Sequence, residues 1–442
     1  MHVENNSADL WLDEARQGAG VTASLLVHGI GQLCTLHDPA LDAAGPRRGE
    51  GLSRLGIFTD AALAVADGRV LAAGREAAVR AAVACSPATV MVDAGGRCIV
   101  PGYVDPHTHA VFGRWREDEY ERRLRGETYL AIAAGGGGIH ASVRDLRARD
   151  TAELVALTVP RLREMGAHGT TTVEIKSGYG LTLADEVKML RVARAAAEAA
   201  GLRVVLTCLA AHEVPAEYRD RRAAYVSLVA DEILPAVARE GLAERLDVFC
   251  EPSVFTLAET ERLVRRGAEL GLAAVLHADE LEPMGGAALA ARLGARSADH
   301  LIRIDAAGIA ALAASRTVAV LLPGTVFTLG LRSYAPAREL IAAGAAVALA
   351  SDFNPGSCPI LSLPLIQALA CTQMRLTPAE ALTACTLNAA WALGRQDEVG
   401  SLAPGKQADF LQLDSDDYRL TPYRAGHNPV AGVWRAGNRA GP

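Results

Sequence analysis

Short strand-like runs alternate with stretches of helical composition from residue 98 onward. Parallel strands joined by crossover helices produce this alternation. The strand-like runs, eight in all, are Cys98–Asp105, Thr170–Lys176, Arg203–Leu209, Leu246–Cys250, Ala273–His277, Ser297–His300, Val318–Leu322 and Ala345–Ala350. Eight such units over about 290 residues fit an α/β fold of the closed (β/α)8 (TIM) barrel type, whose active site lies at the C-terminal ends of the strands. A doubly wound open sheet is the alternative, but the chain lacks a GxGxxG opening to a helix.

The segments on either side of the barrel read differently. Within the barrel, helices are predicted at Leu183–Ala199, Tyr225–Glu240 and Leu257–Glu269. The flanks instead hold short strands, predicted at Leu63–Ala73, Val90–Asp93, Ala408–Leu413 and Val430–Trp434. We expect the two flanks to meet in one small composite β-sandwich domain. The predicted divisions are an N-terminal tail at 1–20, the small β domain at 21–97 and 396–442, and the barrel at 98–395. Residues 38–56, rich in Gly, Pro and Arg, are predicted to be a loop.

Composition favours a small-molecule partner in the cytoplasm. The net charge is −7, and the densest basic run, Arg114–Arg125, is interleaved with acids, so we expect no nucleic-acid binding. The eight cysteines form no CxxC pair, which indicates a reducing compartment. Residues 1–20 carry acidic side chains where a secretory signal would be basic. No uninterrupted apolar stretch reaches the roughly 18 to 20 residues that span a bilayer, so no membrane partner is expected.

Metal-ligating residue types follow three of the predicted strands. His107 and His109 come directly after the first strand, and residues two apart on an extended segment face the same side. His277 ends the fifth strand, and Asp352 follows the eighth. An isolated HxH pair is more often incidental. Here potential metal ligands follow three separate strands, and this agreement favours a metal site. Three imidazoles and a carboxylate suit Zn²⁺ or Fe²⁺.

Two longer segments carry a resemblance to a known superfamily. Residues 101–109 (PGYVDPHTH) resemble the strand-one signature of the amidohydrolase superfamily of metal-dependent hydrolases, and residues 400–410 (GSLAPGKQADF) resemble its return to the small β domain. Dinuclear members carry a carboxylated lysine at the end of strand four, where this chain has Phe249-Cys250-Glu251-Pro252. The nearby Lys176 lies on strand two. The resemblance therefore implies one divalent ion per chain.

Five local segments are similar to one family within that superfamily, the imidazolonepropionases. They are residues 107–113 with Arg116 after them, 171–180, 210–215, 277–280 and 351–357. The resemblance covers residues 60 to 440 and leaves 1–20 and 38–56 without an assigned role. It implies hydrolysis of the cyclic amide C–N bond of 4-imidazolone-5-propanoate to N-formimidoyl-L-glutamate, a step of histidine degradation, by a cytoplasmic homodimer.

The resemblance also implies substrate-binding residues, each of which has a simpler interpretation. Arg116 would bind the propionate carboxylate in bidentate geometry, or it could be a solvated charge in an Arg/Glu-rich helix start. Tyr179 and His212 would contact the ring, or be an ordinary turn residue and a structural histidine. The remaining residues, Asn354, Gly356 and Ser357, would contact the substrate, although locally they indicate only a turn.

Three residues are predicted to be catalytic. Asp352 would accept the proton of a metal-activated water, and His300 would stabilise the oxyanion or else hydrogen-bond within the core. Glu280 would contact substrate and shuttle protons, or merely cap the next helix. Whether Asp352, Glu280 or His300 is the main general base stays open.

Two other functions compete with this hypothesis. A nucleobase deaminase of the same superfamily needs no carboxylate-binding residue, so Arg116 with Tyr179 argues against it. A catalytically inactive scaffold would be expected to lose metal ligands, whereas His107, His109, His277 and Asp352 are all present.

Overall fold

The computed structural model describes residues 9–13, 21–128, 131–132 and 135–440. Within it the chain forms two compact units. We call Met1–Val104, Gly166–Thr171 and Leu363–Pro442 the β unit, and Asp105–Met165 with Thr172–Ser362 the barrel unit. Both units are built from segments far apart in the sequence.

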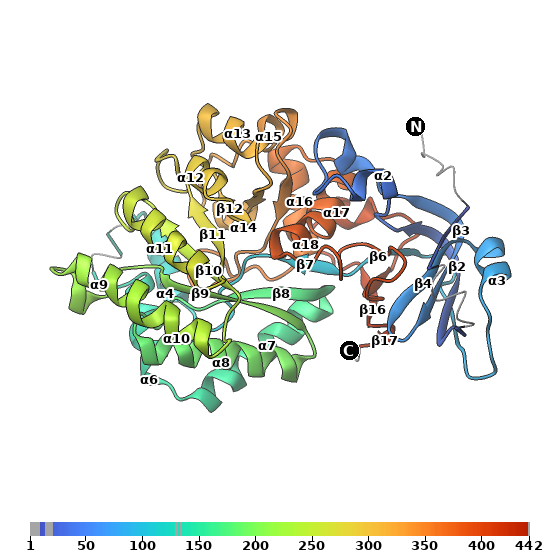
Figure 1. The fold of residues 1–442 in the computed structure, drawn as a ribbon, viewed down its shortest axis with the longest axis horizontal. Coiled ribbons are helices and arrows are strands. Elements are labelled where there is room, and N and C mark those ends of the chain that lie inside the picture. Colours follow the sequence, from blue (N-terminus) through green and yellow to red (C-terminus); the bar gives the residue numbers. More distant parts are fainter. Residues whose placement is uncertain (1–8, 14–20, 129–130, 133–134, 441–442) are drawn as a thin grey trace. The chain divides into compact units, whose positions relative to one another are not determined.

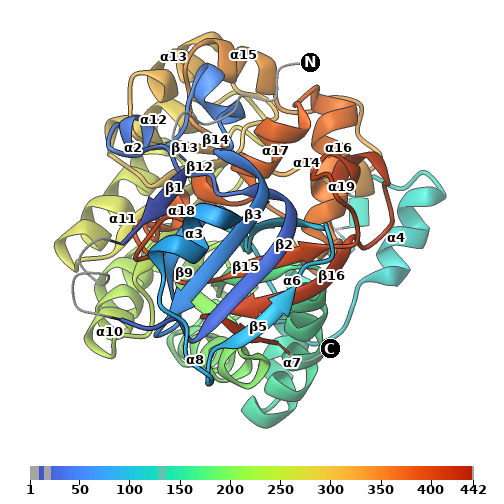
Figure 2. The same cartoon turned by 90° about the vertical axis from the view of Figure 1, so that its right-hand side faces the viewer.

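Strands from both ends of the chain form one sheet in the β unit (Figure 2). The nine-stranded sheet runs in the order β1-β4-β3-β2-β6-β15-β16-β17, with β5 beside β2. The strands are β1 (Leu10–Leu12), β2 (Leu25–Cys34), β3 (Ile57–Ala66), β4 (Arg69–Arg75), β5 (Val90–Asp93), β6 (Cys98–Pro101), β15 (Phe410–Leu413), β16 (Val430–Arg435) and β17 (Asn438–Arg439). Buried side chains from both ends, such as Leu33 and Trp434, share one hydrophobic cluster. The prediction that the flanks build one β domain is confirmed.

Two segments of the β unit are more ordered than predicted. Part of the expected tail is strand β1, which pairs antiparallel with β4; residues 1–8 and 14–20 lie outside the described residues. The expected loop at 38–56 contains helix α2 (Pro39–Asp42), capped by Asp38, and a 3-10 turn at Gly49–Ser53. Backbone N–H and C=O groups of Arg47 bond the Asn388 side chain at 2.8 and 2.9 Å. These long-range hydrogen bonds order residues 38–56, a segment whose local composition is typical of a loop.

The barrel strands form an eight-stranded parallel sheet in sequential order, which confirms the predicted fold class. They are β7 (Tyr103–Asp105), β8 (Thr170–Lys176), β9 (Arg203–Ala211), β10 (Arg245–Cys250), β11 (Ala273–Ala278), β12 (Ser297–His300), β13 (Val318–Leu321) and β14 (Val347–Leu349). The single first strand predicted at Cys98–Asp105 is wrong. The chain pairs with β15 through β6, bends at Gly102, whose N–H bonds Asp409 O, and only then enters β7.

Helices return the chain between successive strands, and Figure 1 shows α7 (Thr151–Ala167), α8 (Leu183–Ala200) and α10 (Leu234–Arg239) around the early strands. Thr182 caps α8, and Gly201 ends it in the left-handed conformation. The helix predicted at Tyr225–Glu240 is instead α9 (Arg222–Leu228), a π turn at Val229–Ile233 and α10. Pro235 at the start of α10 has no N–H to donate, so the regular hydrogen-bond ladder cannot continue there.

The first and last strands meet just beyond their C-terminal ends. Ser351 N donates to Asp105 Oδ1 at 3.1 Å, and Asp352 N donates to His107 O at 3.1 Å. His109 N donates to Phe353 O at 2.8 Å. These bonds nearly close the ring, and they bring residues 107–109 next to Asp352, although more than 240 residues separate them in sequence.

Candidate metal centre and active site

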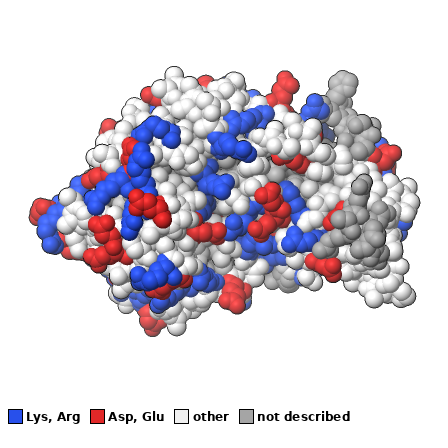
Figure 3. Space-filling view, in the orientation of Figure 1, with Lys and Arg blue, Asp and Glu red and all other residues white. Residues whose placement is uncertain are grey.

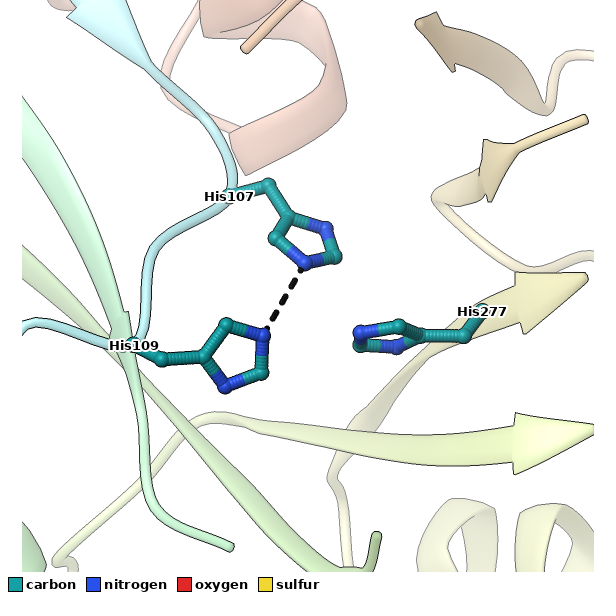
Figure 4. A group of neighbouring side chains, drawn as sticks. All are labelled: His107, His109 and His277. Atoms are coloured by element: carbon teal, nitrogen blue, oxygen red, sulfur yellow. Dashed lines mark hydrogen bonds between the residues drawn. The ribbon is translucent and has the colours of Figure 1, made fainter. Parts of the chain in front are cut away.

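Three histidines from two strand ends converge inside the barrel unit (Figure 4). One nitrogen of each of His107, His109 and His277 lies within 4.8 Å of the others, and all three residues are buried. A second overlapping group joins His107 with His300 and Asp352 under the same limit. The four predicted metal ligands, and the predicted oxyanion residue His300, therefore occupy one place.

The spacing of the ligand atoms matches a tetrahedral site. His107 Nε2 and His109 Nε2 are 3.3 Å apart, and Asp352 Oδ1 lies 3.5 and 3.6 Å from them. Ligands bonded to zinc at about 2.0 to 2.1 Å in tetrahedral geometry stand about 3.3 to 3.4 Å from one another. Lone-pair atoms crowded at this spacing repel one another unless a proton or a cation lies between them. The donor set thus fits a divalent ion.

His107, His109 and His300 are held in the neutral form, in which imidazole can bind a metal. Burial lowers the pKa of His107, His109 and His300 well below the usual value, so their imidazoles are neutral at pH 7. His107 Nδ1–H donates to Asp299 Oδ2 at 2.6 Å, which leaves the Nε2 lone pair directed at the cluster. Burial would also lower the pKa of His277, but its contact with Asp247 outweighs burial and raises it.

Carboxylates behind the histidines were not among the predicted site residues. Asp299 contacts His107, and Asp247 Oδ2 lies 2.9 Å from His277 Nδ1. A signal was available for Asp247, which stands between the apolar Leu246 and Val248 of a predicted strand, and Asp299 directly precedes His300 at the end of another. An acid inside a buried strand needs a partner, and in a metal site that partner is commonly a ligating histidine.

Asp352 and His300 occupy unusual backbone conformations at their strand ends. Their φ angles are +54° and +76°, in a region that costs free energy for residues other than glycine and that often marks a functional site. The Asp352 Oδ2 atom accepts a short hydrogen bond from Thr325 Oγ1, which fixes the carboxylate and leaves Oδ1 facing the histidines. Burial raises the pKa of Asp352 to about 6. Thr325, at the start of α14 (Pro323–Thr328), was not predicted.

Glu280 lies beside His300. Its Oε1 is 3.6 Å from His300 Nδ1, and burial together with the nearby Asp352 charge raises the pKa of Glu280 to about 8. A carboxyl with that pKa can hold a proton at neutral pH. The alternative that Glu280 caps the next helix is wrong, because Asp279 accepts the N–H groups at the start of α12 (Gly286–Arg292) instead.

Arg116 is a buried cation whose hydrogen bonds are incomplete. Its side chain is 4% exposed, and Nε and Nη1 have no hydrogen-bond partner among the described residues. The nearest carboxylate oxygen, on Glu119, is 3.7 Å from Nε. The interpretation of Arg116 as a solvated surface charge is therefore wrong. Gly356 makes room for it, since a Cβ at that position would lie 1.4 Å from Arg116 Nη2.

Tyr179 and His212 lie beside the histidine cluster. Their rings are 5.4 Å apart, and the His212 ring stacks on His109 with centroids 5.1 Å apart. His212 Nδ1–H donates to Gly178 O at 3.0 Å, so Nε2 remains available as a lone-pair acceptor. The loop that carries Tyr179 is fixed by buried Glu186, which accepts the N–H groups of Gly180 and Leu181 at 2.9 and 2.7 Å.

The loop after Asp352 is shaped by Asn354. Its Oδ1 accepts the N–H groups of Gly356 and Ser357 at 2.9 and 2.8 Å, and its Nδ2 donates to Ser357 Oγ at 2.8 Å. Nδ2 also donates to Asp352 O at 2.7 Å. Both ends of the amide are engaged within the turn, which places Gly356 against Arg116.

The charged side chains of the surface are mixed in sign. On the face drawn in Figure 3, acidic and basic side chains are interspersed, and many form pairs such as Arg149 with Asp145 at 2.9 Å. Nucleic-acid-binding proteins instead concentrate one charge on one face. None of the helices in the described parts of the chain combines the length and the apolar character that crossing a bilayer requires.

Comparison with known proteins gives a consistent result. Residues 116–440 match the amidohydrolase family. The imidazolonepropionase of Symbiobacterium thermophilum is 50% identical over 93% of this chain and 96% of its own length, and that of Deinococcus radiodurans is 48% identical over 93% and 98%. A triazine hydrolase variant superposes with TM-score 0.73 at 18% identity, covering 94% of each chain. A zinc-bound adenosine deaminase from Xanthomonas campestris has TM-score 0.69 at 20% identity, covering 95% and 93%. At such identities the solved structures establish the fold alone.

Proposed function

This chain belongs to the amidohydrolase family and, within it, to the imidazolonepropionases, and we propose that it hydrolyses 4-imidazolone-5-propanoate to N-formimidoyl-L-glutamate. The observation that carries the substrate assignment is the buried Arg116 guanidinium, whose Nε and Nη1 make no hydrogen bond within the described part of the chain. Leaving buried charged donors unpaired is costly, and a bound carboxylate would accept hydrogen bonds from the guanidinium. The propionate of the substrate supplies that carboxylate.

The metal site would hold one divalent ion, Zn²⁺ or Fe²⁺, through His107, His109, His277 and Asp352. Support comes from the 3.3 to 3.6 Å spacing of the donor atoms of His107, His109 and Asp352, and from the neutral imidazoles of the first two. Such an ion supplies Lewis acidity, which makes water a nucleophile at neutral pH and polarises a carbonyl.

The chain's own residues would move the protons. Water adds to the ring carbonyl carbon, the ring C–N bond breaks, and the nitrogen leaves with a proton. Asp352, oriented by Thr325, would take the proton from the water, and His300 would stabilise the negative charge on the carbonyl oxygen. Glu280, whose pKa is raised to about 8, could deliver a proton to the leaving nitrogen, as could the protonated Asp352.

Substrate orientation would follow from the residues around Arg116. Tyr179 and His212 would contact the ring, with His212 Nε2 accepting a hydrogen bond, and Glu280 would face the same space. Asn354, Gly356 and Ser357 would line the propionate side, where Gly356 allows the guanidinium to approach. Holding the ring carbonyl near both Asp352 and His300 supplies much of the rate enhancement expected from positioning.

The function is tested by incubating the metal-loaded protein with 4-imidazolone-5-propanoate and following the loss of its ultraviolet absorbance. Mass spectrometry should identify N-formimidoyl-L-glutamate as the product, one water heavier than the substrate. Chelator-treated protein is the control and should be inactive. Faster hydrolysis of guanine or another neutral nucleobase would favour the deaminase alternative.

Metal content gives a separate prediction. Elemental analysis of the purified protein should find one zinc or iron per chain, because the strand-four position of a bridging lysine is occupied by Phe249 to Pro252 and the Lys176 ammonium is already bound by carboxylates. Two tightly bound ions per chain would contradict the mononuclear assignment.

The glycine at position 356 gives a prediction that leaves every charge in place. A Gly356→Ala substitution should raise KM by about tenfold, equivalent to about 1.4 kcal/mol, because the new Cβ would displace the Arg116 guanidinium. The backbone at Gly356 does not have a positive φ, so alanine fits there without backbone strain. Steady-state kinetics with metal analysis would check this. Unchanged KM would show that the position of Arg116 is not critical.

Assembly and location are further proposals. We propose a homodimer in the cytoplasm, supported by the exposed apolar side chains of α4 (Glu117–Leu124), where Tyr120 and Leu124 are 46% and 70% exposed, and by eight free cysteines. Sedimentation velocity would measure the oligomeric state.

A further inference from the structure

A single lysine lies at the centre of the carboxylates beneath the histidine cluster. Lys176 Nζ is 2.9 Å from Glu174 Oε1, 2.9 Å from Asp247 Oδ2 and 4.0 Å from Asp299 Oδ2. The side chains of all four residues are fully buried. Each carboxylate is thereby within ion-pair distance of the same ammonium group.

Two of these carboxylates orient histidine rings directly. Asp299 Oδ2 accepts the Nδ1–H of His107 at 2.6 Å. Asp247 contacts His277 twice, since Oδ2 lies 2.9 Å from Nδ1 and Oδ1 accepts the His277 backbone N–H at 3.2 Å. The orientation of both rings therefore depends on where these two carboxylates stand.

The third carboxylate holds the segment that carries the other histidine. Glu174 Oε2 accepts the N–H of Thr108 at 3.1 Å, and the Thr108 hydroxyl donates to Glu174 O at 2.6 Å. Lys176 adds a backbone bond, donating its N–H to Thr108 O at 3.0 Å. Since Thr108 stands between His107 and His109, these bonds fix the backbone that carries both imidazoles.

We propose that Lys176 is a positioning residue of the metal site, which fixes His107, His109 and His277 through Glu174, Asp247 and Asp299. Three buried carboxylates brought this close repel one another, and each pays a large desolvation cost. The Lys176 ammonium, with Arg245 nearby in the same charge cluster, offsets that repulsion and holds the carboxylates in one arrangement. The inference rests on the metal site proposed above, but not on the identity of the substrate.

The chain uses arginine far more often than lysine. Only three of the 44 Lys and Arg residues are lysines, namely Lys176, Lys188 and Lys406. A compact ammonium directs three N–H donors to three separate acceptors, whereas a planar guanidinium matches one carboxylate side-on. Lys176 Nζ contacts carboxylates of two different strands at 2.9 Å, Glu174 and Asp247, which suits the ammonium.

The same contacts argue against a role as a carboxylated metal ligand. Adding CO₂ to the amine would replace a positive charge with a negative one among three carboxylates. Nζ would also have to give up its contacts with Glu174 and Asp247 at 2.9 Å. Lys176 therefore acts on the metal through the groups that hold the ligands.

The proposal is tested by measuring metal affinity in Lys176→Met, a side chain of similar length without charge. Chelator-stripped protein is titrated with Zn²⁺ against a chromophoric competitor, and the midpoint of thermal unfolding is recorded with and without Zn²⁺. We expect the Zn²⁺ dissociation constant to rise by about 10-fold to 100-fold, the usual effect of losing a group that supports metal ligands, with a smaller stabilisation by Zn²⁺. Lys188→Met is the matched control and should bind Zn²⁺ like the unchanged protein, because Lys188 bonds only Asp185 and carbonyls of residues 146, 147 and 149.

The possible outcomes separate three cases. A lower unfolding temperature in both states with unchanged Zn²⁺ affinity would show a purely structural role and overturn the proposal. If Lys176→Met fails to fold, Lys176→Met/Asp247→Asn removes one charge of each sign and is compared with Asp247→Asn alone. The double variant should bind Zn²⁺ more weakly than Asp247→Asn, because Glu174 and Asp299 still lack the Lys176 ammonium, and equal affinity would overturn the proposal. Failure of the unchanged protein to bind Zn²⁺ or Fe²⁺ would instead refute the metal site itself.

Discussion

Replacing Asp352 with asparagine should lower kcat by about 10²-fold to 10⁴-fold, the range usually contributed by a general acid or base. The amide keeps the shape of the side chain but cannot accept the proton from water. Its oxygen can still face the histidines while its Nδ2 donates to Thr325 Oγ1, so the fold and much of the metal should remain. Rates are measured with 4-imidazolone-5-propanoate on samples of known metal content, so that loss of metal is not mistaken for loss of catalysis.

A matched substitution separates this effect from a general loss of charge. Asp305→Asn changes a carboxylate that caps α13 (Ala306–Ala313), a task that asparagine also performs, and should leave kcat unchanged. Near-normal turnover by metal-loaded Asp352→Asn would transfer the base role to Glu280 or His300. Glu280→Gln and His300→Asn would then decide between those two.

Several parts of the fold followed from local sequence patterns. Strands β8 and β12 and helix α11 (Leu257–Glu269) have the predicted bounds, because apolar periodicity and caps such as Thr256 are local signals. The convergence of His107, His109, His277 and Asp352 was also predictable, since a parallel barrel brings strand ends to one edge. The order and direction of the strands were enough to predict that these four residues lie close together.

Other features depend on contacts that no local pattern shows. The break between β6 and β7 arises because β6 pairs with β15, a strand more than 300 residues away in sequence. The order in residues 38–56 likewise depends on the contact between Arg47 and Asn388. The Lys176 cluster combines side chains of three strands, and sequence alone shows only that charged residues interrupt apolar runs.

Arg116 shows the same limit within the active site. In sequence it opens a helix start crowded with Arg and Glu, and nothing local separates it from Arg114 two residues earlier. In the structure Arg116 is 4% exposed and Arg114 is 59% exposed. Burial comes from the loop that contains Gly356, which follows the eighth strand, so the distinction becomes visible only once the barrel is closed.

The contrast between buried Arg116 and exposed Arg114 provides a matched pair of substitutions that tests the substrate assignment. Arg116→Met should lower kcat/KM for 4-imidazolone-5-propanoate by about 30-fold to 1,000-fold, because removing one partner of a buried charge pair costs about 2 to 4 kcal/mol and each decade corresponds to about 1.4 kcal/mol. Metal content should not change, since Arg116 is not among the ligands. Arg114→Met removes an exposed arginine paired with Asp118 at 3.3 Å and should have little effect.

A substrate analogue then tells carboxylate binding from a structural role. An imidazolone without the propionate has no carboxylate for Arg116 to bind, so its slow hydrolysis should be almost the same in Arg116→Met and the unchanged protein. If the substitution slows both compounds equally, Arg116 supports the shape of the site and the carboxylate argument fails. If only the propionate-bearing compound is affected, the unpaired guanidinium donors are the part of this barrel that selects an acidic imidazolone over a neutral ring.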